Sequence, residues 1–306
     1  MNSMQISNYL EKIRLGRKMR QVDFIDGIVS LRQYQRYRNG ECDIPYENID
    51  SFATKLSIPT QKLMKQFEAE KNKQSELINK FYNAVVNKAN DEVDRLKRMI
   101  ENDIIIDEEK KVYFHHALIL NDFFRGKVSR VDVSRKISNL IGFPDILKQV
   151  YYTDVEVLIM SSLLEFLDDE QKRHLLDKLT ELYDKEETIM SGGTDLIHSL
   201  IIMRLTKSHG SQKNYTDVIR FADLGIQRGL NYKQYYLFDY FFYYKALAHY
   251  ALEDYESFQS DLFRCYNTLH MEGNQKKIKY FSQKIEKDFD IVFDTFIMKY
   301  MKKYIM

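Results

Sequence analysis

The chain has 306 residues, of which 44% are hydrophobic, so it is long enough for one large domain or two ordinary ones with a sizeable core. Its net charge of +1 gives no indication of a polyanionic partner. The charge is unevenly distributed: residues 1–66 hold 11 Lys and Arg against 7 Asp and Glu, and the remaining residues hold 35 Lys and Arg against 38 Asp and Glu. Because the sequence has only 3 Pro and 11 Gly and no long β-branched alternation, we expect an almost entirely helical protein.

The two cysteines, Cys42 and Cys265, lie far apart and match no metal-binding or redox spacing, which favours a reducing compartment. The first 21 residues lack the continuous apolar stretch of a secretory signal. No segment approaches the roughly 18 uncharged apolar residues that a membrane helix needs. We therefore expect a cytoplasmic protein with no membrane partner.

The first 70 residues show the apolar spacing of five short helices with tight connections, which predicts a compact module. Ser30 suits the N-cap of the third helix, Asn39-Gly40 suits its C-terminal stop, and Pro59-Thr60 suits the start of the fifth. The apolar residues of the five helices, in order, are Ile6, Leu10 and Ile13; Val22, Ile25 and Ile28; Leu31, Tyr34 and Tyr37; Ile49, Phe52, Ala53 and Leu56; and Leu63, Met64 and Phe67.

Longer helices follow the charged run EAEKNKQSE at 68–76. Their regular alternation with short breakers predicts antiparallel pairs stacked into a solenoid. We therefore expect a first domain at 1–68 and a helical-repeat domain at 69–306. The expected breakers are Asp103, Gly126, Gly142-Phe143-Pro144, Ser191-Gly192-Gly193 and Gly210.

Two late segments match degenerate tetratricopeptide units, whose consensus period is about 34 residues. Segment 214–225 repeats the second half of segment 245–265, with Tyr215 at the position of Tyr255 and Gly225 at that of Cys265. Phe258 departs from the pattern, because alanine is usual there. In segment 245–265, the small, turn-aromatic, bulky and second small positions hold Ala246, Tyr255, Leu262 and Cys265.

Residues 21–40 have the pattern of a helix-turn-helix: a helix from Gln21, a tight turn at 28–30, and a polar helix whose Tyr34 and Tyr37 face inward. On its own, SLRQYQRYRNG (30–40) is more typical of a solvated helix, but its context favours a helix that enters the major groove. There Arg would read guanine and Gln adenine, each for roughly 1–3 kcal/mol of discrimination. The candidate DNA-binding residues are Gln21, Ser30, Arg32, Gln33, Gln35, Arg36, Arg38 and Asn39, with Arg14, Arg17, Lys18 and Arg20 adding non-specific attraction.

The stretch LEKIRLGRKMRQVDF…SLRQYQRYRNGECDIPYENIDSFATKLSIP resembles the Xre-type helix-turn-helix domain, and within that class the Rgg/MutR-like regulators related to PrgX and PlcR. The resemblance is good over residues 6–67 and architectural beyond them. It implies membership of the RRNPP superfamily of peptide-responsive transcriptional regulators. In those proteins an N-terminal DNA-binding domain is joined to a helical-repeat domain that dimerises and binds a short signalling peptide.

One departure concerns the packing of this module. The family usually has a glutamate at the position of Arg38, paired with an arginine that aligns with Arg14, but here both residues are arginine. Either Asp50, Glu41 or another acid substitutes, or Arg38 turns outward to phosphate.

Half of the residues in NYKQYYLFDYFFYYKALAHY (231–250) are tyrosine or phenylalanine. If Ala246 is the small residue of a first repeat helix, an aromatic stripe faces the concave side, where it would sandwich apolar peptide side chains and bind peptide backbone groups. The alternative is ordinary packing between repeats. The candidate peptide-binding residues are Tyr236, Tyr240, Tyr243, Leu247 and Tyr250, with Met203 and Lys207 from the preceding pair.

The segment FDTFIMKYMKKYIM (293–306) has a wide apolar face that would either cap the solenoid or pack against a second subunit. A symmetric homodimer is expected for a helix-turn-helix protein because two half-sites are contacted at once.

No phosphate-binding loop, metal-ligand spacing or catalytic constellation is evident, so we expect no cofactor, no metal and no enzyme activity. The sequence favours an all-α regulator with double-stranded DNA, a signalling peptide and a second copy as partners. Two alternatives stay open: a DNA-binding regulator whose repeats bind a protein partner and no peptide, and a tetratricopeptide-type scaffold or phosphatase-like protein.

Overall fold

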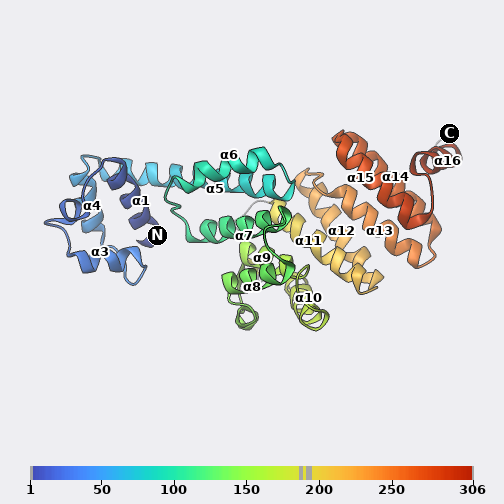
Figure 1. Cartoon of the computed structure of the whole chain (residues 1–306), viewed down its shortest axis with the longest axis horizontal. Coiled ribbons are helices and arrows are strands. Elements are labelled where there is room, and N and C mark those ends of the chain that lie inside the picture. Colours follow the sequence, from blue (N-terminus) through green and yellow to red (C-terminus); the bar gives the residue numbers. More distant parts are fainter. Residues whose placement is uncertain (1–2, 186–188, 191–194, 305–306) are drawn as a thin grey trace. The chain divides into compact units, whose positions relative to one another are not determined.

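A computed structural model describes residues 3–185, 189–190 and 195–304 of the chain (Figure 1). The chain divides into two compact units, Met1–Leu140 and Ile141–Met306. Regular structure in the described residues is helical apart from two strands of two residues, β1 (Tyr152–Thr153) and β2 (Ile189–Met190), which pair in parallel. The prediction of an all-α protein is therefore confirmed.

The first unit starts with four short helices and continues with a longer one. The five helices expected in the first 70 residues are all present. The helices of this unit are α1 (Ser3–Gly16), α2 (Gln21–Ile25), α3 (Leu31–Arg38), α4 (Tyr46–Lys55), α5 (Thr60–Val86), α6 (Asn90–Glu101), α7 (Glu108–Phe124) and α8 (Arg130–Ile141), the last of which ends at the unit boundary.

Three aromatic rings form the centre of the N-terminal core. The rings of Phe24 and Phe52 stack with centroids 4.9 Å apart, and the ring of Tyr34 lies 6.0 Å and 5.9 Å from them. Two residues assigned to the apolar stripes are exposed instead: Val22 by 55% and Leu31 by 48%. Each lies in the first turn of its helix, where no other described element covers it.

The predicted length of the fifth helix is wrong. Helix α5 continues through the charged run to Val86, because seven of its nine residues are Ala, Glu, Lys or Gln, which are good helix formers, and it contains neither Gly nor Pro. Its Gln74 side chain accepts a hydrogen bond from the Ile106 amide at 2.9 Å and donates one to the Ile104 carbonyl at 2.8 Å. The expected domain boundary at 68/69 lies inside this helix, although the N-terminal core draws its residues from 6–67 with Ile106 as the one addition.

The second unit consists of helix pairs, and the first helices of successive pairs also contact one another, α9 with α11 and α11 with α13. In Figure 1, α11, α12, α13 and α14 lie side by side, as expected for stacked repeats. Its elements are η1 (Asp145–Lys148), β1, α9 (Asp154–Leu163), α10 (Asp169–Asp184), β2, α11 (Asp195–Ser211), α12 (Tyr215–Tyr232), α13 (Phe238–Ala251), α14 (Tyr255–Glu272), α15 (Gln275–Phe289) and α16 (Phe293–Tyr304).

The prediction of tetratricopeptide-like units in α12–α14 is confirmed by the burial of their small and bulky positions. Ala246, Leu262 and Cys265 are fully buried, and Tyr255 begins α14. Gly225 lets α13 approach α12 closely, because a Cβ atom built there would lie only 2.3 Å from the Cζ atom of Phe241.

The breakers Asp103, Gly126 and Gly142 all follow helix ends, and both glycines have a positive φ, 69° and 66°. Gly210 is a wrong prediction, because it lies inside α11; a glycine within a helix costs only about 1 kcal/mol relative to alanine, which tertiary packing overrides. The breaker at 191–193 lies outside the described residues.

Helix α16 packs on α14. Phe293 is buried against the ring of Tyr266 at 5.4 Å, and the Tyr300 ring lies 5.2 Å from that of Phe263. Within the chain the segment therefore covers the last repeat, while Met298 stays exposed. Among the described residues no helix is both long and apolar enough to cross a membrane.

Gly225→Ala should destabilise the second unit by about 1–3 kcal/mol, because the added methyl group forces the Phe241 ring out of the α12–α13 contact. Urea denaturation followed by circular dichroism measures the change. The matched control is Gly210→Ala, whose Cβ would meet only Val218 at an ordinary 3.6 Å. Equal midpoints for wild type and Gly225→Ala would contradict the close packing.

Candidate functional site

The candidate DNA-reading helix α3 is closed at both ends by local hydrogen bonds. The Ser30 hydroxyl accepts a hydrogen bond from the Gln33 amide at 3.1 Å, which confirms Ser30 as the N-cap. At the other end the Gly40 amide donates to the Tyr37 carbonyl and the Glu41 amide to the Arg36 carbonyl, which is the Schellman arrangement. Gly40 supplies the required positive φ of 71°.

The inner face of α3 is held by its two tyrosines, as predicted. Tyr34 and Tyr37 are both almost fully buried. The Tyr34 hydroxyl donates to the Glu11 carboxylate at 3.0 Å, and the Tyr37 hydroxyl accepts from the Asn48 side chain at 3.0 Å. These bonds tie α3 to α1 and to α4.

Glu11 supplies the negative charge that compensates Arg14 and Arg38, the two arginines at the positions of the family's usual ion pair. Its carboxylate accepts two hydrogen bonds from Arg14, at 2.6 Å and 2.8 Å, and lies 3.8 Å from a terminal nitrogen of Arg38. The compensating acid is therefore neither Asp50 nor Glu41. It lies one helical turn before Arg14 on α1, where one carboxylate serves both arginines and Tyr34.

The pKa of Glu11 reflects these partners. Burial raises the pKa of the carboxyl group, but the hydrogen bonds from Arg14 and Tyr34 and the positive charges of Arg14 and Arg38 outweigh burial, so the pKa lies below its ordinary value. The carboxylate is thus the stable form at neutral pH, as a buried ion pair requires.

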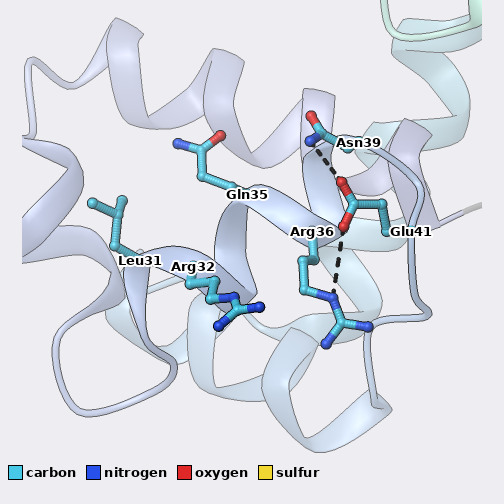
Figure 2. Close-up of a pocket in the computed structure, with 6 residues that line it drawn as sticks. All are labelled: Leu31, Arg32, Gln35, Arg36, Asn39 and Glu41. Carbon is cyan, nitrogen blue, oxygen red and sulfur yellow. Dashed lines mark hydrogen bonds and ion pairs between the residues drawn. The ribbon is translucent and has the colours of Figure 1, made fainter.

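The outer face of α3 borders an open groove, shown in Figure 2. Arg32 and Arg36 extend their guanidinium groups to the same side, and the Gln35 amide points elsewhere. Both arginines are exposed, and Gln35 is half-buried. The residues that line the groove are Leu31, Arg32, Gln35, Arg36, Asn39 and Glu41.

Some candidate DNA-binding side chains already have partners within the module. The Gln33 amide donates to the Cys42 sulfur at 3.2 Å and accepts from Arg36 at 3.3 Å. Asn39 donates to Glu41 at 2.9 Å. Gln21 is the half-buried first residue of α2.

The basic residues before α2 fall into two groups. Lys18 is exposed, and Arg17 is exposed while one of its guanidinium nitrogens donates to the Leu56 carbonyl. Arg14 is buried against Glu11, and Arg20 forms a fork with Asp23 at 2.6 Å and 2.7 Å. The expected contribution of Arg14 to non-specific attraction is therefore wrong, because its charge is buried and paired.

The candidate peptide-binding tyrosines divide by burial. Tyr243 is fully buried, its hydroxyl donates to Asp288, and the Lys284 ammonium lies 5.0 Å from its ring centroid. Tyr250 packs against Phe258 and Phe289, each with ring centroids 5.1 Å away. Tyr243 therefore serves packing between repeats, whereas Tyr250 packs there with part of its ring and stays 40% exposed.

Tyr240 is half-buried beside a pair of charges. Its ring lies edge-on to Phe281 at 4.9 Å and has the Lys277 ammonium at 5.5 Å. Lys277 in turn lies 3.0 Å from the buried Asp239 and 2.6 Å from Glu272. Burial, with the Asp239 charge, raises the pKa of Tyr240 to about 12, so its hydroxyl stays a hydrogen-bond donor at neutral pH.

The remaining stripe residues are accessible to differing degrees. The prediction that Tyr236 shares the helix face is wrong, because α13 begins at Phe238 and Tyr236 lies in the turn before it. Tyr236, Leu247 and Met203 are half-buried, and Lys207 is exposed with its ammonium 2.8 Å from Glu165. In the described part of the chain, no group of three His, Cys, Asp or Glu side chains could hold a metal ion.

Sequence reasoning missed three kinds of residue. Glu11 could have been found from its position three residues before Arg14 on the buried face of α1. Glu41 was expected only as a possible partner of Arg38; its place beside the groove follows from the helix-ending Asn-Gly before it. Lys277 and Lys284 had no sequence signal, because the contact of α15 with α13 is visible only in three dimensions.

The geometry defines an all-α chain in which a helix-turn-helix with a fixed inner face and an exposed Arg- and amide-bearing outer face precedes tetratricopeptide-like helix pairs. The comparison with solved structures places this chain in a known fold. No family model matches the sequence, and neither does any curated protein.

The fold is shared with several solved structures, among them three with TM-scores of 0.50 to 0.53. The chain is similar to ComR from S. thermophilus in complex with DNA and its signalling peptide ComS, with a TM-score of 0.53, 11% identity, and coverage of 92% of this chain and 99% of that one. Apo ComR from Streptococcus vestibularis has a TM-score of 0.51 and 11% identity, with coverage of 94% of this chain and 99% of that one. A putative transcriptional regulator from Listeria monocytogenes EGD-e has a TM-score of 0.50 and 14% identity, with coverage of 94% of this chain and 97% of that one. The resemblance expected from the sequence is thus confirmed for the fold.

Glu11→Gln should lower the free energy of unfolding of the first unit by about 3 kcal/mol near pH 7, because Arg14 then stays buried without its counter-charge. The lowered pKa of Glu11 means that the carboxylate stabilises the fold above the pKa of an unfolded glutamate, about 4.3. That contribution is lost as the pH falls through the folded pKa, so the two proteins should converge in acid.

Urea denaturation near pH 7 and in acid measures the difference in the free energy of unfolding between Glu11→Gln and wild type. Glu92→Gln is the matched control: its pair with Arg95 has the same i,i+3 spacing and the same 2.6 Å distance, but the side chains are 44% and 56% exposed rather than 7% and 10%. A Glu11→Gln protein as stable as wild type near pH 7 would remove the central role of Glu11.

Proposed function

We propose that the chain is a sequence-specific DNA-binding transcriptional regulator of the RRNPP type, with its DNA-binding domain at 1–68 and a peptide-sensing, dimerising repeat domain at 69–306. The observation that carries the proposal is the construction of α3: buried tyrosines behind, and exposed Arg32 and Arg36 in front, on the second helix of a helix-turn-helix.

The reading roles follow from side-chain chemistry. Arg32 and Arg36 would donate pairs of hydrogen bonds to guanine O6 and N7, and Gln35 to adenine. Gln33 and Asn39 would join them once their internal partners move. Phosphate contacts, which position the protein without reading sequence, are assigned to Gln21, Ser30, Arg17, Lys18 and Arg38.

The likeness to a fold solved with DNA and a signalling peptide supports the same pair of ligands here. For the peptide, we assign the first-helix face of the repeats. There Tyr240 and Leu247 from α13, with Tyr236 from the turn before it, accompany Met203 and Lys207 from α11. Tyrosine rings offer apolar area, and hydroxyls and the lysine offer groups for backbone or terminal carboxylate. Tyr243 would support that face from behind, and Tyr250, which is 40% exposed, would border it.

A homodimer completes the proposal, because a two-fold arrangement lets two α3 helices contact two half-sites of one operator. Peptide binding to the repeats would then change the spacing or orientation of the two DNA-binding domains.

Arg32→Ala/Arg36→Ala should lose sequence-specific DNA binding, with a reduction of at least about 30-fold in affinity for a selected duplex. The duplex comes from selection of a random library by the wild type, and fluorescence anisotropy measures affinity. The control is Arg95→Ala/Arg135→Ala, which removes two exposed, paired arginines from α6 and α8.

Unchanged specific binding by the α3 variant would overturn the assignment of the recognition helix. A wild type that binds no duplex even at low salt would instead favour a repeat scaffold.

Tyr240→Ala should weaken binding of a short apolar peptide about tenfold, since the half-buried ring offers both apolar surface and a hydroxyl. Calorimetry with a library of short synthetic apolar peptides provides the measurement, and Tyr46→Ala, an exposed tyrosine of α4, provides the control. If no peptide binds the wild type while DNA does, the chain is a regulator whose repeats serve a protein partner or dimerisation alone.

A further inference from the structure

One carboxylate lies on the surface where the other polar groups suit DNA. Glu41 borders the groove together with Arg32, Gln35, Arg36 and Asn39, as Figure 2 shows. A surface that only attracted phosphates would exclude an acid, because like charges repel. The position of this acid therefore calls for a role of its own.

The backbone places Glu41 beside the reading residues. Its amide donates to the Arg36 carbonyl at 2.9 Å as part of the Schellman end of α3, which returns the chain over the last turn of that helix. In such ends the corresponding pair of side chains frequently makes an apolar contact. Here the pair is Glu41 and Arg36, and the contact is ionic.

Glu41 contacts two candidate reading residues at once. One carboxylate oxygen accepts from the Asn39 side chain at 2.9 Å, and the other lies 3.7 Å from the Nε atom of Arg36. On its far side Arg36 donates from a terminal nitrogen to Gln33 at 3.3 Å. A guanidinium has five N–H donors, so the fork of its two terminal nitrogens keeps about three of them for a ligand.

The Arg36–Glu41 pair is of the exposed kind, with side chains 45% and 52% exposed. Such pairs contribute little to stability in water. Removing the Glu41 charge should therefore leave the fold intact, since the backbone bonds of the Schellman end do not involve its side chain.

We propose that Glu41 is a positioning and specificity-determining residue of the DNA-reading surface. It directs the Arg36 fork toward a guanine edge and disfavours a phosphate at the same place. This inference rests on the proposed DNA-binding function.

The physical reason lies in the two ligands open to an arginine on DNA. A phosphate satisfies the guanidinium without regard to sequence, whereas guanine O6 and N7 satisfy it at one base pair. A carboxylate 3.7 Å from the Arg36 guanidinium neutralises part of its charge and repels an approaching phosphate, but leaves the directional donors for the uncharged base. Discrimination thus rises while non-specific affinity falls.

The test compares Glu41→Gln with wild type, using the selected duplex and a scrambled duplex of the same length and composition. We expect affinity for the scrambled duplex to rise about three- to tenfold and the ratio of selected to scrambled affinity to fall about tenfold. The matched control is Glu47→Gln, which removes the same charge from an exposed residue of α4 that does not line the groove.

A second readout separates positioning from general electrostatics. Repeating the selection with Glu41→Gln and with Arg36→Ala should weaken the same guanine preference in both, and the double variant should lose no further discrimination. An unchanged ratio in Glu41→Gln, or an equal loss in Glu47→Gln, overturns the inference while the regulator proposal stands. If the wild type does not distinguish any duplex, both fall.

Discussion

The N-terminal module depends on the buried ion pair of Glu11 with Arg14 on α1, whose carboxylate also accepts a hydrogen bond from the Tyr34 hydroxyl of α3 and faces Arg38. A buried carboxylate is costly unless charge and hydrogen bonds compensate it, and here three partners do so. The same contacts connect the helix that carries the candidate reading residues to the first helix of the chain. The orientation of α3 is therefore set by the contact of its Tyr34 hydroxyl with Glu11 and by the packing of its Tyr34 ring against Phe24 and Phe52.

The outer face of α3 follows the opposite design. Its pairs are exposed and weak, so Arg36, Asn39 and Glu41 can exchange partners at little cost. A helix that reads DNA, as we propose for α3, needs a fixed backbone and movable side chains. Base edges are read only if the backbone is fixed, while the side chains must leave their internal partners to meet the bases. The strong interactions of the module accordingly lie on its inner side.

The second unit combines aromatic packing and small residues with ion pairs such as that of Lys277 with the buried Asp239. Gly225 admits the Phe241 ring between α12 and α13, and Tyr243, Tyr250 and Phe258 fill the space between successive pairs. The tyrosine-rich segment thus has two uses within one helix. Its buried members hold α13 against α15, and its half-buried members, with Tyr240 beside Lys277, form the face to which we assign the peptide.

The sequence by itself determined what local rules govern: the helical content, the caps at Ser30 and Gly40, the inward Tyr34 and Tyr37, and the small residues Ala246 and Cys265 of the repeat. Only the tertiary structure decided that Glu11 also faces Arg38 and Tyr34, that Val22 and Leu31 stay exposed, and that Tyr243 is buried by α15. The reason is physical. Caps and helical periodicity involve neighbours within a few residues, whereas the partner of a buried charge or ring comes from whichever distant segment packs against it, and spacing along the chain carries no record of that contact.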